Sequence, residues 1–174
     1  MAAIEHGPIQ IRITAYFTFS FSGMLPAMPK AFLISLAILL GAVVSSAQTP
    51  QAAIEKVLDD QHASWNRHDL DSFMTSYWNS PEVTFSSKGK TLMGWQSVFD
   101  RYRKTYQAAG AEMGKVEFTD MKIEMLGEDA AFVRGQFHLT LSDGKTPHGV
   151  FTLIFRKFPD GWKIVHDHTS AAEN

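Results

Sequence analysis

Apolar residues recur every three or four positions in three segments after residue 48, and this spacing is typical of amphipathic helices. The first helix is predicted to follow Thr49-Pro50 and to be interrupted at residues 66–69. Asp69 is a suitable N-cap for a second, short helix, because its carboxylate can accept a hydrogen bond from the first turn. A third helix is predicted to begin at Trp95 and to end near Gly110.

Alternation of apolar and polar residues predicts one strand between the second and third helices and four strands after the third. A phase slip at Asp120-Met121 indicates a β-bulge in the first of the late strands. The predicted strands cover residues 83–86, 116–126, 131–141, 149–158 and 162–169, and turns separate the last four. An order with helices early and a meander of strands late indicates an α+β domain.

The region before residue 48 differs in composition from the rest of the chain. It has a basic start at Lys30, an uncharged apolar run and a small-residue cleavage pattern that ends at Ala47. These features predict a signal peptide over residues 28–47 and an exported domain, periplasmic or secreted, over residues 48–174. The apolar run is shorter than the ~20 residues of a membrane span, so contact with a membrane is expected only through this segment if it stays uncleaved. We interpret residues 1–27 as a doubtful N-terminal extension.

Composition restricts the classes of function. A chain of 174 residues has the length of one ordinary domain, and its formal charge of −2 gives no electrostatic reason to expect a nucleic acid partner. Cysteine is absent, so disulfides, thiol nucleophiles and cysteine zinc sites are excluded. No phosphate loop, nucleophile elbow or dinucleotide fingerprint occurs, and no cofactor is expected. Thirteen Phe, four Trp and four Tyr suit a fold that lines a cavity with aromatic rings.

Three segments carry a resemblance to a known family: residues 65–71, residues 83–95 and the C-terminal residues 160–170, which contain His166-Asp167-His168. Together with the order of elements, they resemble the nuclear transport factor 2-like superfamily, in particular its SnoaL-like branch. They are also similar to the association domain of calcium/calmodulin-dependent protein kinase. The resemblance covers about residues 50–172. It implies a curved antiparallel or mixed sheet wrapped around three N-terminal helices, a cone-shaped cavity, and a homodimer formed through the sheet.

The resemblance also implies positions for ligand-binding residues. Arg134 matches a cavity arginine of the kinase association domain, and Asp167 matches a residue inside the cavity. At the positions of two further cavity arginines this chain has Thr152 and Thr169. The tyrosine and two aspartates of bacterial ketosteroid isomerases have no matching set here. The family hosts isomerases, cyclases, dehydratases, oligomerisation domains and binding proteins, so it does not by itself define an activity.

Strand geometry groups the candidate residues into faces, because residues two apart point the same way. In the segment 131–141, Arg134, Gln136 and His138 share one face, so if Arg134 faces the cavity the other two do as well. In the last strand, Val165, Asp167 and Thr169 share one face. The opposite face is predicted to carry Trp162, Ile164, His166 and His168. The pattern leaves open which of these two faces lines the cavity.

These residues support a catalytic and a structural interpretation. Asp167 can act as a general base, with His138 as acid or oxyanion partner and Arg134 fixing an anionic group. Alternatively, Asp167 forms an ion pair that stiffens the sheet. His166 and His168 are predicted to be interface or supporting residues. No metal site is predicted, because a third ligand for the two imidazoles is missing.

Tyr77, Trp95 and Tyr102 are the aromatic residues that we expect to contact a ligand, and the two tyrosine hydroxyls need hydrogen-bond partners. The sequence thus predicts an exported, dimeric SnoaL-like domain that binds a small, mostly apolar molecule. One alternative is a cofactor-free isomerase, cyclase or hydratase with Asp167 as general base. The other is a non-catalytic dimerisation or assembly module.

Overall fold

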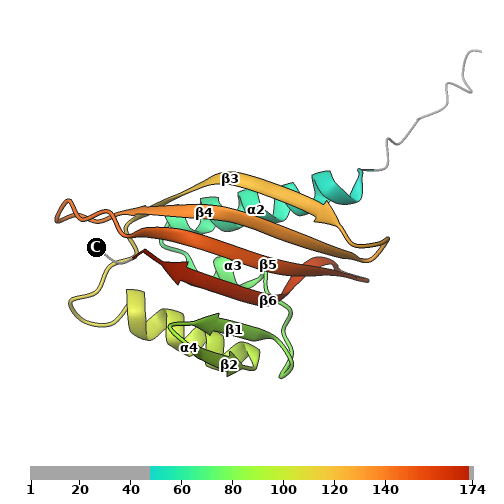
Figure 1. Ribbon diagram of the computed structural model, residues 1–174. Helices are drawn as coiled ribbons and strands as arrows, with labels where there is room; N and C mark the ends of the chain where they lie inside the picture. Colours follow the sequence, from blue (N-terminus) through green and yellow to red (C-terminus); the bar gives the residue numbers. More distant parts are fainter. Residues whose placement is uncertain (1–47, 173–174) are drawn as a thin grey trace, which may run out of the picture. The chain divides into compact units, whose positions relative to one another are not determined.

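A computed structural model describes residues 48–172 of the chain (Figure 1). The predicted signal peptide at 28–47 and the doubtful extension at 1–27 lie outside the described residues. Within residues 48–172, no helix is long and apolar enough to cross a membrane.

Three helices form where the sequence predicts them, and side chains cap the first two. Thr49 Oγ1 accepts a hydrogen bond of 3.2 Å from the Ala52 amide, and the Asp69 carboxylate accepts one of 3.0 Å from the Ser72 amide. The third helix ends at Tyr106, earlier than the predicted end near Gly110. The helices are α2 (Pro50–Asn66), α3 (Leu70–Met74) and α4 (Trp95–Tyr106).

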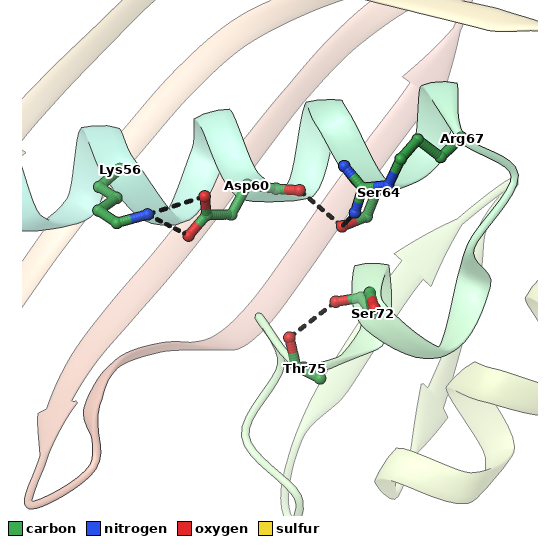
Figure 2. Close-up of polar contacts among 6 residues, drawn as sticks. All are labelled: Lys56, Asp60, Ser64, Arg67, Ser72 and Thr75. Atoms are coloured by element: carbon green, nitrogen blue, oxygen red, sulfur yellow. Dashed lines mark hydrogen bonds and ion pairs between the residues drawn. The ribbon is translucent and has the colours of Figure 1, made fainter.

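Polar contacts support the two N-terminal helices along their length (Figure 2). Lys56 and Asp60 form an exposed ion pair of 2.7 Å one turn apart on α2. The Ser64 hydroxyl donates to the Asp60 carbonyl at 2.7 Å, and Arg67 donates to the Ser64 hydroxyl at 3.3 Å. These contacts run along α2 to its C-terminal end, where the chain turns into α3.

A six-stranded, curved and unclosed sheet follows the order β2-β1-β6-β5-β4-β3, and the predicted α+β class is confirmed. All neighbouring strands are antiparallel except β1 and β6, which are parallel. The strands are β1 (Thr84–Ser87), β2 (Lys90–Met93), β3 (Lys115–Met125), β4 (Ala130–Thr140), β5 (His148–Phe158) and β6 (Gly161–Ala171).

Strand β2 is absent from the predicted order. It has only four residues, and all but one are exposed, so it lacks the alternation that marks a strand. A tight turn at Lys88-Gly89, where both residues have positive φ, joins it to β1. β2 is therefore a strand because it pairs with β1 in a hairpin, and its own residue pattern does not predict it.

The core lies between the helices and one face of the sheet, which we call the inner face. Helix α2 packs against β3 and β6, α4 packs against β1 and β2, and α3 contacts both other helices (Figure 1). The largest fully buried side chains include Ile54 and Leu58 of α2, Val133 of β4 and Phe155 of β5. Burial of these apolar side chains is the main source of stability.

Two bulges decide which residues reach the inner face. The predicted bulge in β3 is confirmed, since the pairing with β4 shifts at Asp120, which has a φ of 51°. The second bulge lies in β6, where Ile164 and His166 pair with consecutive residues of β5 and Val165 is left between them. The extra residue reverses the alternation after Ile164.

The predicted faces of the last strand are therefore partly wrong. Trp162 and Ile164 are buried, as is Asp167, so the three lie on the inner face together. Asp167 and Thr169 do share a face opposite His166 and His168, as predicted. The predicted faces assume a strict alternation along the whole strand, and the extra residue Val165 breaks that alternation.

Candidate functional site

A cavity of about 90 Å³ opens between the helices and the inner face of the sheet. Aromatic and aliphatic side chains form most of its wall, and Asp167 is the only carboxylate in it. Its lining residues are Gln61, Trp65, Phe73, Tyr77, Tyr102, Tyr106, Val116, Phe118, Phe137, Leu139, Phe151, Leu153, Asp167 and Thr169.

Asp167 is 3% exposed and is held by two hydroxyl groups. The Tyr77 hydroxyl donates to Asp167 Oδ2 at 2.6 Å, and Thr169 Oγ1 donates to Asp167 Oδ1 at 2.8 Å. The Tyr102 hydroxyl lies 3.2 Å from the Tyr77 hydroxyl. The four side chains form one hydrogen-bonded group in an otherwise apolar wall.

Backbone contacts explain how Tyr77, ninety residues earlier in the chain, reaches Asp167. Tyr77 follows α3 and forms a bridge to Ile164 of β6. The amide of Trp78 donates to the Ile164 carbonyl at 2.9 Å, and the Ile164 amide donates to the Ser76 carbonyl at 2.8 Å. This pairing fixes the segment after α3 against the strand that carries the acid.

Burial raises the pKa of the Asp167 carboxyl above its ordinary value of 3.8. The hydrogen bonds from Tyr77 and Thr169 oppose that rise, and electrostatic interactions with His166 and Arg101 oppose it further. Burial also raises the pKa of the Tyr77 and Tyr102 hydroxyls well above 10.0, and the charge of Asp167 adds to both shifts. Both tyrosines therefore stay protonated and available as donors at neutral pH.

Packed rings form the wall around this group. The Tyr102 ring makes edge contacts with Phe73 and Phe85 at centroid distances of 5.1 and 5.7 Å. Trp65 Nε1 donates to the Met113 carbonyl at 3.0 Å, which satisfies its only donor. The Gln61 amide donates to the buried Ser76 hydroxyl at 2.7 Å. Gln61 adds a neutral polar group to the cavity that the sequence pattern did not identify.

Four of the predicted site residues come together here: Asp167, Tyr77, Tyr102 and Thr169. Trp95 does not line the cavity. Its ring stacks on Phe99 at a centroid distance of 5.0 Å, and its Nε1 donates to the Met74 carbonyl at 3.2 Å. Trp95 therefore packs α4 onto α3 and does not lie in the cavity, where the sequence-based prediction placed it.

The predicted cavity residues of β4 and β5 lie on the opposite, outer face of the sheet. Arg134 and His138 are exposed, whereas their sequence neighbours Val133 and Leu139 are buried. Gln136 donates to the exposed Asp120 at 2.9 Å, and Thr152 pairs with Arg134 across the strands. The inward assignment of Arg134, Gln136, His138 and Thr152 is therefore wrong. Burial of the apolar members of each strand forces the polar members outward.

The two histidines that flank Asp167 also lie on the outer face. His166 Nδ1 is 2.7 Å from the Thr84 hydroxyl of β1, and His168 is exposed. His138 and His148 stack in parallel with ring centroids 6.0 Å apart. Among residues 48–172, no three His, Asp or Glu side chains gather closely enough to hold a metal ion.

The arrangement can do three things chemically. An ionised Asp167 can accept a hydrogen bond from a polar group in the cavity, in competition with Tyr77 and Thr169. A carboxylate with a raised pKa in an apolar site can also take a proton from a bound molecule. The buried tyrosine hydroxyls can donate to a negatively charged oxygen.

The family model for the SnoaL-like domain matches residues 54–173, which is most of the chain. The chain belongs to this family, within the nuclear transport factor 2-like superfamily. A search of curated proteins gave no match.

Solved structures agree with this assignment. An NTF2-like protein of unknown function from Shewanella oneidensis is 38% identical, with a TM-score of 0.64 over 70% of this chain and 99% of its own. A proposed calcium/calmodulin-dependent protein kinase type II association domain from Thiobacillus denitrificans is 24% identical, with a TM-score of 0.58 over 72% and 96% of the two chains. An NTF2-like superfamily protein from Salmonella enterica is 22% identical, with a TM-score of 0.56 over 70% and 89%. The last two likenesses concern the fold alone.

Proposed function

We propose that this chain binds a small, mostly apolar molecule whose polar group contacts Asp167. The observation that carries the proposal is the single buried carboxylate in a wall of aromatic rings. Pockets that bind small molecules combine a mainly apolar lining with a few convergent polar groups. Here the convergent groups are Asp167, Tyr77 and Thr169.

The volume of the cavity limits the ligand. About 90 Å³ is less than the ~150 Å³ of an engineered cavity that holds benzene. The lining side chains of Tyr106, Phe118 and Phe137 are partly exposed, so the cavity reaches the surface between them. A ligand would insert a short segment with its polar group and leave the remainder at this opening.

Two four-carbon probes test the role of the carboxylate. 1-Butanol can donate a hydrogen bond, whereas butanone can only accept one. We expect 1-butanol to bind about tenfold more tightly once Asp167 is ionised, since hydrogen bonds to charged groups contribute about 1.5–3 kcal/mol. The preference should increase as the pH rises through the raised pKa of Asp167. Chemical shifts of Gln61 and Thr169 would report binding in NMR titrations.

The matched control is the exposed carboxylate of Asp160. Asp167→Asn is expected to abolish the pH-dependent preference for 1-butanol, and Asp160→Asn is expected to retain it. Equal affinities for the two probes at all pH values would contradict the proposal, as would a preference that survives Asp167→Asn.

A second candidate is proton transfer without a cofactor, with Asp167 as general base. The raised pKa of this buried carboxyl favours it, because a base is most effective when its pKa is close to the working pH. The outward position of His138 removes the partner that the sequence suggested. Tyr77 takes that place in this proposal, since its hydroxyl stays protonated and lies directly beside the carboxylate.

Deuterium exchange into butanone distinguishes catalysis from binding. In D₂O, Asp167 would take a proton from the carbon next to the carbonyl. The Tyr77 hydroxyl, released from the neutralised carboxyl, would then turn and donate to the enolate oxygen. We expect exchange above the buffer rate that is lost in Asp167→Asn and reduced in Tyr77→Phe. Saturable binding without enhanced exchange would contradict the catalytic proposal and support binding alone.

We also propose that the protein forms homodimers through the outer face of the sheet. Phe132 and Ile154 pair there across β4 and β5, and Val150, four residues away along β5, is 55% exposed. Light scattering should give the mass of two chains, and Val150→Lys should give the mass of one. A single-chain mass for the unmodified protein would contradict this proposal.

Export remains a proposal that rests on the sequence of residues 28–47. Expression in a bacterium that processes signal peptides should yield a protein that begins at Gln48. Recovery of the uncleaved chain from the membrane fraction would contradict it.

A further inference from the structure

A second hollow lies between α4 and the hairpin of β1 and β2, and we call it the α4 groove. It has a volume of about 440 Å³. This volume falls in the range of small-molecule sites, about 300–1,000 Å³. It shares no lining residue with the Asp167 cavity.

The α4 groove concentrates positive charge in a chain whose net charge is negative. Lys88, Lys90, Arg101 and Lys104 line it, and Asp100 is its only carboxylate. The formal charge of the whole chain is −2. A concave surface lined by one sign of charge raises the local concentration of ions of the opposite sign.

Among residues 48–172, none of these four cations forms an ion pair with a carboxylate. The ion pairs within residues 48–172 use Lys56, Lys145 and Lys163. Asp100 instead accepts a hydrogen bond of 3.0 Å from Gln96. The charges of the groove are therefore left for solvent ions or for a ligand.

Local structure brings the cations together from two elements. Arg101 and Lys104 are three residues apart on α4 and share a helix face. Lys88 and Lys90 flank Gly89 at the hairpin turn, and Lys88 has a φ of 50°. Asn, Asp and Gly are the residues favoured at such positions. A lysine at this position is unfavourable for the turn, and binding of an anion by its charge would explain why it is there.

An apolar floor accompanies the charge. Phe85 and Leu92 line the same groove. The Arg101 guanidinium lies 4.4 Å from the Phe85 ring centroid, and this stacking limits the freedom of the arginine. The groove thus offers a positioned guanidinium, three ammonium groups and an apolar surface.

We propose that the α4 groove binds a small organic dianion, a phosphate monoester with a compact apolar body. Four cations against one carboxylate exceed what a single carboxylate ligand would neutralise, and a tetrahedral dianion can contact ammonium groups from both sides. The charged group binds between the turn lysines and Lys104, and the apolar body covers Leu92.

Phenyl phosphate is the probe that tests this site, and NMR titration and calorimetry are the measurements. We expect saturable binding, with chemical-shift changes concentrated in residues 85–105. Lys90→Gln with Lys104→Gln should weaken binding at least tenfold. Lys122→Gln with Lys157→Gln removes the same charge from exposed positions outside the groove and should leave the affinity unchanged.

Equal weakening in both double variants would overturn the proposal, because the effect would then reflect net charge alone. Shifts concentrated around Asp167 would also overturn it. Inorganic phosphate should bind more weakly than phenyl phosphate, and equal affinities would overturn the role of the apolar floor. If the groove double variant does not fold by circular dichroism, Lys88→Gln with Lys122→Gln as its control gives the same comparison.

Discussion

The Asp167 cavity and the α4 groove handle polar groups in opposite ways. The cavity measures about 90 Å³, is mostly apolar and satisfies its one carboxylate with two internal hydroxyl donors. The groove measures about 440 Å³ and leaves four cations without a carboxylate partner among the described residues. Among the buried side-chain nitrogen and oxygen atoms of residues 48–172, none lacks a hydrogen-bond partner.

This difference has a consequence for ligand binding. A molecule that enters the cavity shares Asp167 with the hydroxyls of Tyr77 and Thr169, so its gain is limited to about one hydrogen bond. An anion that enters the groove displaces only water and counterions, so its gain depends on salt. The cavity therefore selects ligands by their shape and their hydrogen-bond donors, whereas the groove selects ligands by their negative charge.

The largest expected effect concerns the apolar wall of the cavity. Phe151 is 6% exposed and its ring packs on Phe118 at a centroid distance of 5.5 Å. Phe151→Ala should lower the free energy of unfolding by about 3–5 kcal/mol, because it removes buried surface and leaves a larger cavity. In the monomeric protein, Val150→Ala, one residue away on the outer face, should change it by less than about 0.5 kcal/mol. Chemical denaturation measures both, and similar losses would contradict the assignment of faces on β5.

The next effect concerns the buried acid. Asp167→Asn should cost about 1–3 kcal/mol at acidic pH, because the amide replaces one oxygen by a donor and one of the hydroxyls of Tyr77 and Thr169 loses its acceptor. The folded-state pKa of Asp167 is raised, so its favourable contribution is complete below the unfolded pKa and is lost as the pH rises through the folded pKa. The stability difference between wild type and Asp167→Asn should therefore shrink from pH 3 upward. A difference that grows with pH would show that the folded-state pKa is lowered.

A smaller effect separates the two tyrosines. The hydrogen bond from Tyr77 to Asp167 Oδ2 lowers the pKa of this carboxyl. Tyr77→Phe removes that hydrogen bond, so the pKa of Asp167 should rise further. Tyr102→Phe removes a hydroxyl that contacts Tyr77 rather than the acid, so the pKa should change less. Carbon-13 NMR titration of the Asp167 carboxyl measures both values. Equal shifts in the two variants would mean that Tyr77 has no privileged contact with the acid.

The smallest effect is expected in the groove. Lys90→Gln with Lys104→Gln should change the free energy of unfolding by less than about 0.5 kcal/mol, because both side chains are exposed and neither forms an ion pair among the described residues. Thermal or chemical denaturation would check this. A loss comparable to that of Asp167→Asn would mean that the groove lysines support the fold, and the contrast between the two hollows would fail.

Local signals in the sequence were sufficient for the helices and most strands. Thr49 and Asp69 are capping residues whose effect is confined to one helical turn, so their positions fix the helix starts. Turn residues and alternation likewise fix the four late strands. The short β2 was missed because long-range pairing, rather than its own pattern, makes it a strand.

The candidate site was only half predictable for a similar reason. Tyr77 and Tyr102 were identified because buried hydroxyls need partners, and Asp167 because of the family resemblance. Gln61 carries no such signal, and its place depends on how α2 crosses the sheet. The faces of β4 were assigned from the resemblance at Arg134. The pattern of Ala131, Val133 and Leu139 would have given the opposite and correct assignment.

The bulge at Val165 bears on how this family varies. Ile164 and Asp167 are an odd number of residues apart, yet both face inward, because the extra residue absorbs the mismatch. Removing Val165 would give a regular strand in which Ile164, Asp167 and Thr169 keep their side. A relative that is one residue shorter here can therefore hold its acid in the same place. An alignment gap beside this aspartate indicates a change of strand length and no loss of the site.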